Sequence, residues 1–453
     1  MNPHALESNR GLPDEYLIGK GQAWFAFAMT IGLMLFDYLD RQIIVSLFPY
    51  MKAEWGLSDK QLGSLVSIVS ITVALGALPV ALLADRYSRV KSIVAMATVW
   101  SLATISCMFT RNYGQLLAAR ALVGLGEAGY GSVGAALLSS VFPARMRAAL
   151  LAAFFASASV GSVLGVLLGG MIAAKWGWKA AFGVVGVPGL LLALLYLKVR
   201  DYRTVELTPE LSDVTQSTGS TAKFIARALL RSPTMFWVCL GGAAQLIVVS
   251  SIWAWLPSFL NRYHGVAADQ AGARAALVVL CGAVGSVVWG AVVDRSGKNR
   301  KRNKLFTMAA LCLAGVAVLA PTFAATGPGS VLSLPAQFAL IAVGGFLMTC
   351  TVGPVSAVVI DVVHPGVRAT GASVLSLFQN LFGLAAGPFL AGVLSDSLGL
   401  AAAMAIVPLS GALAAVFFLL AARSYERDLT RVGTVRIEAE ADGPVAGPRK
   451  AMA

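Results

Sequence analysis

Apolar runs of about 20 residues, separated by short polar segments, recur along almost the whole chain. A run of that length crosses the hydrocarbon core of a bilayer as an α-helix, the form that satisfies every backbone hydrogen bond within the segment. The pattern therefore predicts twelve transmembrane helices. Their approximate spans are 22–48, 60–84, 92–109, 113–140, 148–174, 181–199, 233–260, 271–293, 305–325, 333–360, 370–395 and 400–422.

The predicted helices form two halves of six. The first six-helix half covers 22–199 and the second covers 233–422, with a polar central loop at 200–232 between them. Polar tails precede and follow the halves at 1–21 and 423–453. The fold class that we expect is an all-α membrane protein built from these two halves.

Lysine and arginine are distributed unevenly among the loops. If the N-terminus is cytoplasmic, the cytoplasmic loops hold eighteen of them and the outside loops seven. The positive-inside rule then places both termini and the central loop in the cytoplasm. This topology accounts for most of the net charge of +13, so we expect contact with membrane lipids rather than with nucleic acid. We expect a monomer in the inner (plasma) membrane of a bacterium.

Composition supports the membrane class and argues against other chemistries. Hydrophobic residues make up 57% of the chain and charged residues 13%, whereas a soluble protein carries roughly 25% charged residues. The five cysteines and three histidines show no metal-ligand spacing, and neither a phosphate-binding loop nor a nucleophile–base pairing emerges. We therefore expect no metal, no cofactor, no catalytic residue and no enzymatic activity.

Five ionisable residues lie inside predicted helices. Asp37, Asp40 and Arg41 are in the first helix, and Arg120 and Glu127 are in the fourth. Charges at membrane depth are costly and persist where they pair inside the bundle or face a water-filled path. Residues three, four and seven apart share a helix face, so the spacing predicts one charged face on each helix.

We expect Asp40 and Glu127, with Asp37 beside them, to take up and release a proton, while Arg41 and Arg120 act as alternating partners. Protonation of a carboxylate frees its arginine, which can then attract an anionic substrate. The alternative is a permanent set of ion pairs that only holds the helices together. Because buried ion pairs are weak stability devices, the sequence favours proton coupling.

A short motif occurs twice, after the second and the eighth predicted helix. Residues 81–91 read ALLADRYSRVK, and residues 290–298 read GAVVDRSGK. The equivalent places in the two halves indicate a parallel internal repeat, which suits alternating access. The pattern G-x-x-x-D-R-x-G-[RK] in twin positions resembles the major facilitator superfamily of secondary transporters. The resemblance covers about 20–422 and implies that family's twelve-helix fold.

The charged residues of the repeated motif are expected to form a cytoplasmic gate that bridges the halves in the outward-facing state. Charge pairs that break and re-form can bias a two-state equilibrium. The alternative is a plain stop-transfer loop. The first copy departs from the family pattern, with Ala81 and Ser88 in place of glycines. The predicted gate residues are Asp85, Arg86, Arg89, Asp294, Arg295 and Gly297.

The fifth predicted helix carries Gly161, Gly165 and Gly169, one glycine every fourth residue. Such a stripe lets helices approach closely. In the superfamily it lies where the two halves meet. We therefore expect a helix-packing face there, which either only packs or also forms part of the moving surface.

The charged helices also resemble a narrower group. Residues 37–41 read DYLDR, as in the first helix of both the spinster-type lipid transporters and the anion:cation symporters of sugar acids. Residues 120–130 read RALVGLGEAGY and resemble the spinster pattern R-x-x-x-G-x-G-E-A-x-Y. The resemblance implies that charged residues of these segments handle protons and an anionic or zwitterionic head group, although Asp37 stands where that family often has asparagine.

Apart from Arg274, near the start of the predicted helix 271–293, the second half has no charged residue inside a predicted helix. Its polar residues either line a substrate path or join helices by hydrogen bonds. The apolar character of this half suits a substrate that has an apolar portion. Besides Arg41 and Arg120, the candidate substrate contacts are Tyr130, Gln245, Trp253, Gln379 and Asn380.

The sequence therefore predicts a secondary active transporter. We expect it to use protons to move an organic anion, or an amphiphile such as a lysophospholipid, by alternating access. Two alternatives remain open: proton-coupled symport of a small sugar acid or aromatic acid, and proton-antiport drug export, which also uses intramembrane acids. A non-transporting receptor would have little reason to keep five intramembrane charges.

Overall fold

The computed structural model describes residues 16–86, 88–201, 232–326, 332–363 and 368–431. The described residues are helical with no β-strand, and twelve of their helical spans are long and apolar enough to cross a membrane. This confirms the predicted fold class. Most of the expected central loop and of the two tails lies outside the described residues.

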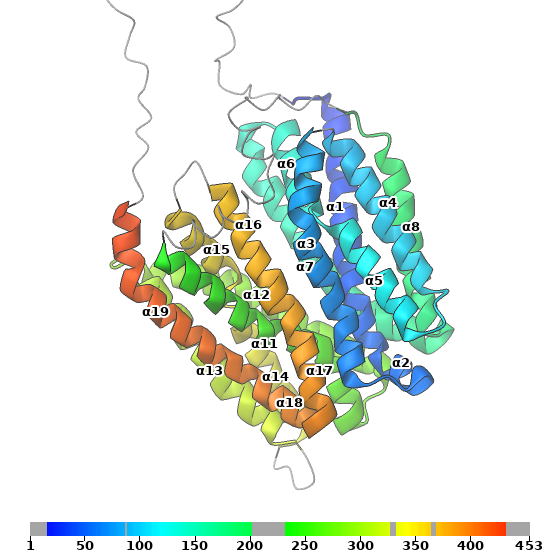
Figure 1. Ribbon diagram of the computed structural model, residues 1–453, viewed down its shortest axis with the longest axis vertical. Helices are drawn as coiled ribbons and strands as arrows, with labels where there is room; N and C mark the ends of the chain where they lie inside the picture. The colour runs from blue at the N-terminus through cyan, green and yellow to red at the C-terminus, as the bar shows by residue number, and fades with distance from the viewer. Residues whose placement is uncertain (1–15, 87, 202–231, 327–331, 364–367, 432–453) are drawn as a thin grey trace, which may run out of the picture.

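The first half contains six spans, two of which are divided into shorter helices (Figure 1). They are α1 (Lys20–Ile43) with the turn η2 (Ile44–Leu47) and α2 (Phe48–Trp55), α3 (Asp59–Arg86), α4 (Arg89–Cys107), α5 (Tyr113–Glu127) with α6 (Tyr130–Val141), α7 (Ala144–Trp176) and α8 (Trp178–Tyr196).

The second half follows the same order. Its spans are α11 (Pro233–His264), α12 (Ala268–Ser296), α13 (Asn303–Ala324), α14 (Leu334–Met348) with α15 (Val352–Asp361), α16 (Arg368–Phe378) with the π-helical segment η4 (Gln379–Ala385) and α17 (Ala386–Leu398), and α18 (Leu400–Ile406) with η5 (Val407–Leu409) and α19 (Ser410–Arg431). The last helix thus continues to Arg431, beyond the predicted end near 422.

Glycine turns occur at equivalent places in the two halves. Gly56 and Gly265, with φ of 62° and 61°, follow the first span of each half. Gly177 and Gly399, with φ of 82° and 85°, separate the fifth span from the sixth. Only glycine enters this left-handed region without strain. The repeated turns support the parallel internal repeat indicated by the sequence motif.

The two halves lean together at one end and diverge toward the end that carries the first and last described residues (Figure 1). We call these the closed end and the open end. The halves meet along α3 with α17 and along α7 with α12. Backbones touch there: a Cβ added at Gly63 would overlap the carbonyl oxygen of Pro388, and one at Gly392 would overlap that of Asp59.

Three apolar cores follow this shape. One core lies within the first half, a second lies within the second half, and the third draws residues from both halves. In the shared core, the rings of Phe48 and Trp255 lie 5.1 Å apart between centroids. Helices in a membrane associate mainly through close packing, so the shared core joins the halves at the closed end.

The glycine stripe of α7 faces α1 of its own half. A Cβ at Gly165 would lie 2.5 Å from the carbonyl oxygen of Leu39, and one at Gly169 would lie 2.7 Å from that of Ile43. The expectation that this stripe lies between the halves is therefore wrong. The next residue, Gly170, is the one that meets the second half, with Ala268 as its neighbour.

Replacing Gly161 by valine should destabilise the first half, because its Cβ would overlap the carbonyl oxygen of Leu35. Overpacking of this kind typically costs about 1–3 kcal/mol. A thermal unfolding curve of the purified protein in detergent should show a lower midpoint. Gly290→Val is the matched control, because nothing lies within 4 Å of its Cβ position. An equal loss in both variants would contradict the close approach.

Candidate functional site

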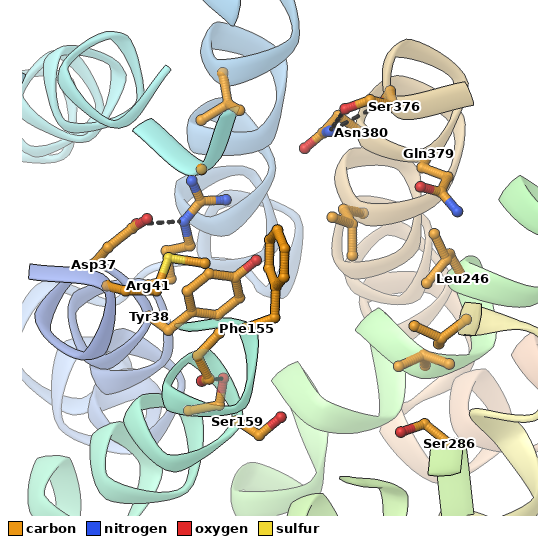
Figure 2. A pocket seen from close by; sticks show the side chains of 18 of the residues that line it. Asp37, Tyr38, Arg41, Phe155, Ser159, Leu246, Ser286, Ser376, Gln379 and Asn380 are labelled. Atoms are coloured by element: carbon orange, nitrogen blue, oxygen red, sulfur yellow. Dashed lines mark hydrogen bonds and ion pairs between the residues drawn. The ribbon is translucent and has the colours of Figure 1, made fainter. Parts of the chain in front are cut away.

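A cavity of about 630 Å³ lies between the two halves. Figure 2 shows Asp37 and Arg41 on one side of it, with Gln379 and Asn380 on the other. The first half supplies the charged lining residues, whereas the lining residues from the second half are all uncharged. The cavity therefore presents two chemically different walls to a ligand.

Three charged residues of the first half form what we call the cavity triad: Asp37, Arg41 and Glu127. The Arg41 Nε atom lies 2.9 Å from Asp37 Oδ1 and 2.9 Å from Glu127 Oε2. Its N–H donates to Asp37, while both carboxylate oxygens of Glu127 lack a hydrogen-bond partner. Glu127 is therefore paired with Arg41 by charge, without a hydrogen bond.

A second pair lies behind the cavity wall. Arg120 Nη1 is 3.5 Å from Asp40 Oδ1, and both side chains are almost completely buried, at 0% and 1% exposure. The Thr104 hydroxyl donates to Asp40 Oδ2 at 2.7 Å. Arg120 Nε and Nη2 have no hydrogen-bond partner. The pair balances one negative charge with one positive charge and does not belong to the lining of the cavity.

The sequence places these side chains by simple helical geometry. Asp37 and Arg41 are four residues apart on α1 and form an i,i+4 pair. On α5, Gly124 and Gly126 allow close approach to the neighbouring helices. A Cβ at Gly126 would lie 2.5 Å from the backbone nitrogen of Trp100. The glycines of R-x-x-x-G-x-G-E thus bring the buried charges of α5 toward those of α1.

Besides Arg120, two predicted substrate contacts do not line the cavity. Tyr130 is fully buried and donates its hydroxyl to the carbonyl oxygen of Thr30 at 2.7 Å. Gln245 is also buried and donates its amide to the carbonyl oxygen of Met348 at 2.8 Å. For Tyr130 the cause is the turn at Gly129, whose φ of 81° redirects the chain. Both residues join helices in this structure.

The other predicted contacts of the second half do line the cavity: Trp253, Gln379 and Asn380. The indole Nε1 of Trp253 is buried without a hydrogen-bond partner. Sequence reasoning missed Tyr38 and Phe155, which stand beside Arg41 in Figure 2. The guanidinium of Arg41 lies 5.4 Å from the centre of the Tyr38 ring. The sequence signal that could have identified Tyr38 was its position next to Asp37.

The predicted gate residues lie near the open end, and the contacts described for them stay within one half. Arg89 donates to the Ser140 hydroxyl at 2.9 Å. Asp294 Oδ1 lies 3.0 Å from Lys304 Nζ, beside exposed Arg295, and Gly297 packs against the Lys304 side chain. The side chains of Asp85 and Arg86 lie outside the described residues. A bridge between the halves stays a prediction for the state that closes this end.

No group of three His, Cys, Asp or Glu residues is placed to hold a metal ion in the part of the chain that the structure describes. The lining of the cavity consists of the charged residues Asp37, Arg41 and Glu127, aromatic rings, neutral hydrogen-bonding groups and apolar side chains.

A model of the Major Facilitator Superfamily matches residues 30–386. The chain is 26% identical to Protein spinster homolog 3 of Danio rerio, over 94% of this chain and 90% of that protein. It is 27% identical to an MFS-type efflux pump of Mycolicibacterium smegmatis, over 91% of this chain and 95% of the pump.

The fold is also similar to that of a bacterial homolog of the human lysosomal transporter Spinster, solved in an inward-facing and unoccupied conformation. The TM-score is 0.78 at 21% sequence identity, over 91% of this chain and 99% of the other. At that identity the likeness establishes the fold alone.

Replacing Arg120 by alanine should lower the free energy of unfolding by about 3–5 kcal/mol, because Asp40 would become an unpaired buried charge. The additional change Asp40→Asn should recover much of this loss, since a neutral amide can still accept from Thr104. Arg111→Ala, at an exposed position, is the control. Thermal unfolding of the three proteins tests the pairing, and a double variant no more stable than Arg120→Ala would contradict it.

Proposed function

Because this chain belongs to the major facilitator superfamily of membrane transporters, we propose that it is a proton-coupled secondary transporter of an organic anion or of an anionic or zwitterionic amphiphile. A lysophospholipid is the model substrate of the second class. The proposal specifies what the family leaves open, namely the coupling ion and the substrate. It describes transport rather than an enzymatic reaction.

The observation that carries the proposal is the charge imbalance of the buried groups. The cavity triad holds two carboxylates and one guanidinium, whereas the pair behind it holds one of each. One carboxylate is in excess. An uncompensated carboxylate away from water is strongly disfavoured, and a proton is the smallest ion that neutralises it. The site is therefore suited to exchange one proton.

We assign that proton first to Glu127. Its side chain is 0% exposed, and neither of its oxygens accepts a hydrogen bond. Asp40, the other carboxylate expected to carry a proton, is held by Arg120 and Thr104. Asp37 accepts from Arg41 and is the neighbour with which Glu127 shares its counter-charge. Arg120 then acts as the fixed partner of Asp40.

Arg41 links the proton to the substrate. Protonation of Glu127 removes one of the two negative charges at the guanidinium, whose planar N–H groups suit a carboxylate or phosphate. The Arg41 side chain is 17% exposed and lines the cavity, so an anion can reach it. Coupling between two ligands is reciprocal: the proton strengthens binding of the anion, and the anion strengthens binding of the proton.

The uncharged wall is suited to the remainder of an amphiphile. The side chains of Gln379 and Asn380 offer hydrogen bonds near Leu246 and Leu384, which offer apolar surface. Sites with a few polar groups on an apolar lining fix orientation and hold the bulk of a ligand. A head group at Arg41 with its chain against the second half would use both walls. The similarity to spinster proteins supports this class of substrate.

The unequal distribution of lysine and arginine supports the membrane placement that we propose. Both termini would be cytoplasmic in a bacterial plasma membrane. The open end carries the first and last described residues, so the cavity would then face the cytoplasm. Movement to a state open on the other side would complete alternating access by a monomer.

A second candidate is proton-coupled drug export. The 27% identity to an MFS-type efflux pump favours it, and Asp37 and Glu127 would then bind a cationic substrate directly. Arg41 discriminates between the two functions, because a cation in the cavity would be repelled by this guanidinium, whereas an anion would be attracted.

A ligand screen by thermal shift should show selective stabilisation by lysophospholipids or small organic acids. A ligand present at 100 times its Kd stabilises the folded state by about 2.7 kcal/mol. Arg41→Gln should lose this stabilisation, since it lacks the charge that binds the anion. Arg111→Ala should keep it. Stabilisation by cationic drugs alone, retained in Arg41→Gln, would support export instead.

Anion binding should weaken as pH rises, because deprotonated Glu127 competes for Arg41. In Glu127→Gln the affinity should stay near the low-pH value of the unaltered protein at every pH, and uptake into proteoliposomes should no longer respond to a pH gradient, while exchange continues. The exposed Arg111→Ala variant is again the control. Uptake driven normally by pH in Glu127→Gln would exclude this role.

A further inference from the structure

A cluster of charged and aromatic side chains joins two helices of the first half at the closed end. Glu54 and Trp55 are the last two residues of α2, and Trp178 and Lys179 are the first two residues of α8. None of the four lines the cavity. We call these four residues the α2–α8 cluster.

The cluster lies at the level of the polar head groups of a bilayer. Helix α7 ends at Trp176 and α8 begins at Trp178, so two spans end there. The first span, Lys20–Trp55, has 36 residues and a length of about 54 Å, which exceeds the hydrocarbon core of about 30 Å. Its last part, α2, is therefore free to lie outside that core, and Figure 1 shows α2 at the outer edge of the first half. Tryptophan is enriched at this level.

The ammonium group of Lys179 stands in a corner formed by two indole rings. The rings of Trp55 and Trp178 are perpendicular, with centroids 5.0 Å apart. Lys179 Nζ lies over both rings, 5.3 Å from the centre of Trp55 and 5.4 Å from that of Trp178. Both distances are within the range of a cation–π interaction. The rings thus hold the cation in place and leave its N–H groups available as donors.

The carboxylate of Glu54 is anchored through one of its two oxygens. The indole N–H of Trp178 donates to Oε2 at 2.6 Å. The other oxygen, Oε1, lies 3.9 Å from Lys179 Nζ, which is longer than a hydrogen bond. The side chains of Glu54 and Lys179 are 50% and 36% exposed. An anion and a cation therefore stand side by side, each accessible to a ligand.

Such a pair of charges is complementary to a zwitterion of the opposite polarity. A head group with one phosphate and one primary ammonium can place the phosphate at Lys179 and the ammonium at Glu54, so that each cation has an anion on either side. A quaternary ammonium has no N–H to donate to the carboxylate. An anionic head group without an amine would bring its charge close to Glu54. The cluster thus favours a phosphoethanolamine head group over both.

We propose that the α2–α8 cluster binds the phosphoethanolamine head group of a phospholipid in the leaflet at the closed end. Lys179 donates to a phosphate oxygen, and Glu54 accepts from the primary ammonium. The two indole rings position Lys179. A lipid is favoured over a soluble molecule of the same chemistry because the cluster stands where two membrane spans end. The site is separate from the cavity, and the proposal depends neither on the transported substrate nor on the coupling ion.

The test is the affinity of the purified full chain, in detergent, for single lipids. Native mass spectrometry resolves the first bound lipid and gives its Kd. Dioleoyl phosphatidylethanolamine, phosphatidylcholine and phosphatidylglycerol are titrated separately. The ethanolamine lipid should bind roughly tenfold more tightly than either of the others, which is the effect of one hydrogen bond to a charged group. Equal Kd values for the three lipids would overturn the proposal.

Two single variants locate the preference. Lys179→Gln should weaken binding of all three lipids, because it removes the cation that takes the phosphate. Glu54→Gln should bring phosphatidylethanolamine to the level of phosphatidylcholine and strengthen phosphatidylglycerol, while its amide still accepts from Trp178. Lys175→Gln is the matched control, at an exposed lysine of the same end outside the cluster, and should keep the preference. An equal loss in the control would show a general attraction of lysine for phosphate and contradict the site.

Two further results would also overturn the proposal. If the cluster only fastens α2 to α8, Glu54→Gln lowers the midpoint of thermal unfolding but leaves the order of the three lipids unchanged. If the ligand is a soluble molecule, O-phosphoethanolamine displaces the lipid at concentrations near the lipid's own Kd. We expect displacement only at far higher concentrations, because the soluble head group lacks the acyl chains that contact the spans. Should Lys179→Gln fail to fold, the lipid order in Glu54→Gln decides.

Discussion

The presence of one more acid than base among the buried charged residues is the constraint on which the site depends. Burying carboxylates is unfavourable unless each finds a counter-charge, and here Asp37 and Glu127 share the single guanidinium of Arg41. If each acid had its own arginine, the residues would form permanent ion pairs that only hold the helices together. Because one acid has to share, the proposed function has a proton and a substrate anion act on the same cation. In that proposal the imbalance is the reason why the cluster binds two coupled ligands.

The proposed transport cycle also requires the two halves to move relative to each other, and the packing of the halves is suited to this. Each half keeps its own apolar core, so it can move as a body, and the shared core joins them at the closed end alone among the described residues. Helix α1 serves both needs. Its charged residues face the cavity and α5, while Leu39 and Ile43 pack against the α7 glycines. Close contact of α1 with α7 fixes the position of the charged residues of α1 within the first half.

Sequence reasoning recovered the twelve spans and placed Asp37 and Arg41 on one helix face, because these follow from hydrophobic run length and the period of the helix. It did not determine which acid faces which arginine across helices: Asp40 pairs with Arg120 through packing of α1 on α5. Tyr130 was expected to contact the substrate, but the turn at Gly129 directs its side chain into the helix packing, away from the cavity. The hydrogen-bonded pair of Asp59 and Arg262 at the closed end was missed altogether, since 203 residues separate the two and each reads alone as an ordinary charge at a helix end.

The eleventh span connects the cavity to the closed end. Gln379 and Asn380 line the cavity and begin the π-helical segment η4, a geometry that is frequent at functional sites. The same segment ends at Ala385, whose carbonyl oxygen accepts from Ser67 of the first half at 2.6 Å. Asp396 follows on the same span. A ligand shifts a conformational equilibrium only by binding the two states unequally. A ligand that contacts Gln379 and Asn380 differently in the two states would therefore act on the eleventh span. This span also carries Ala385 and Asp396, which contact the first half.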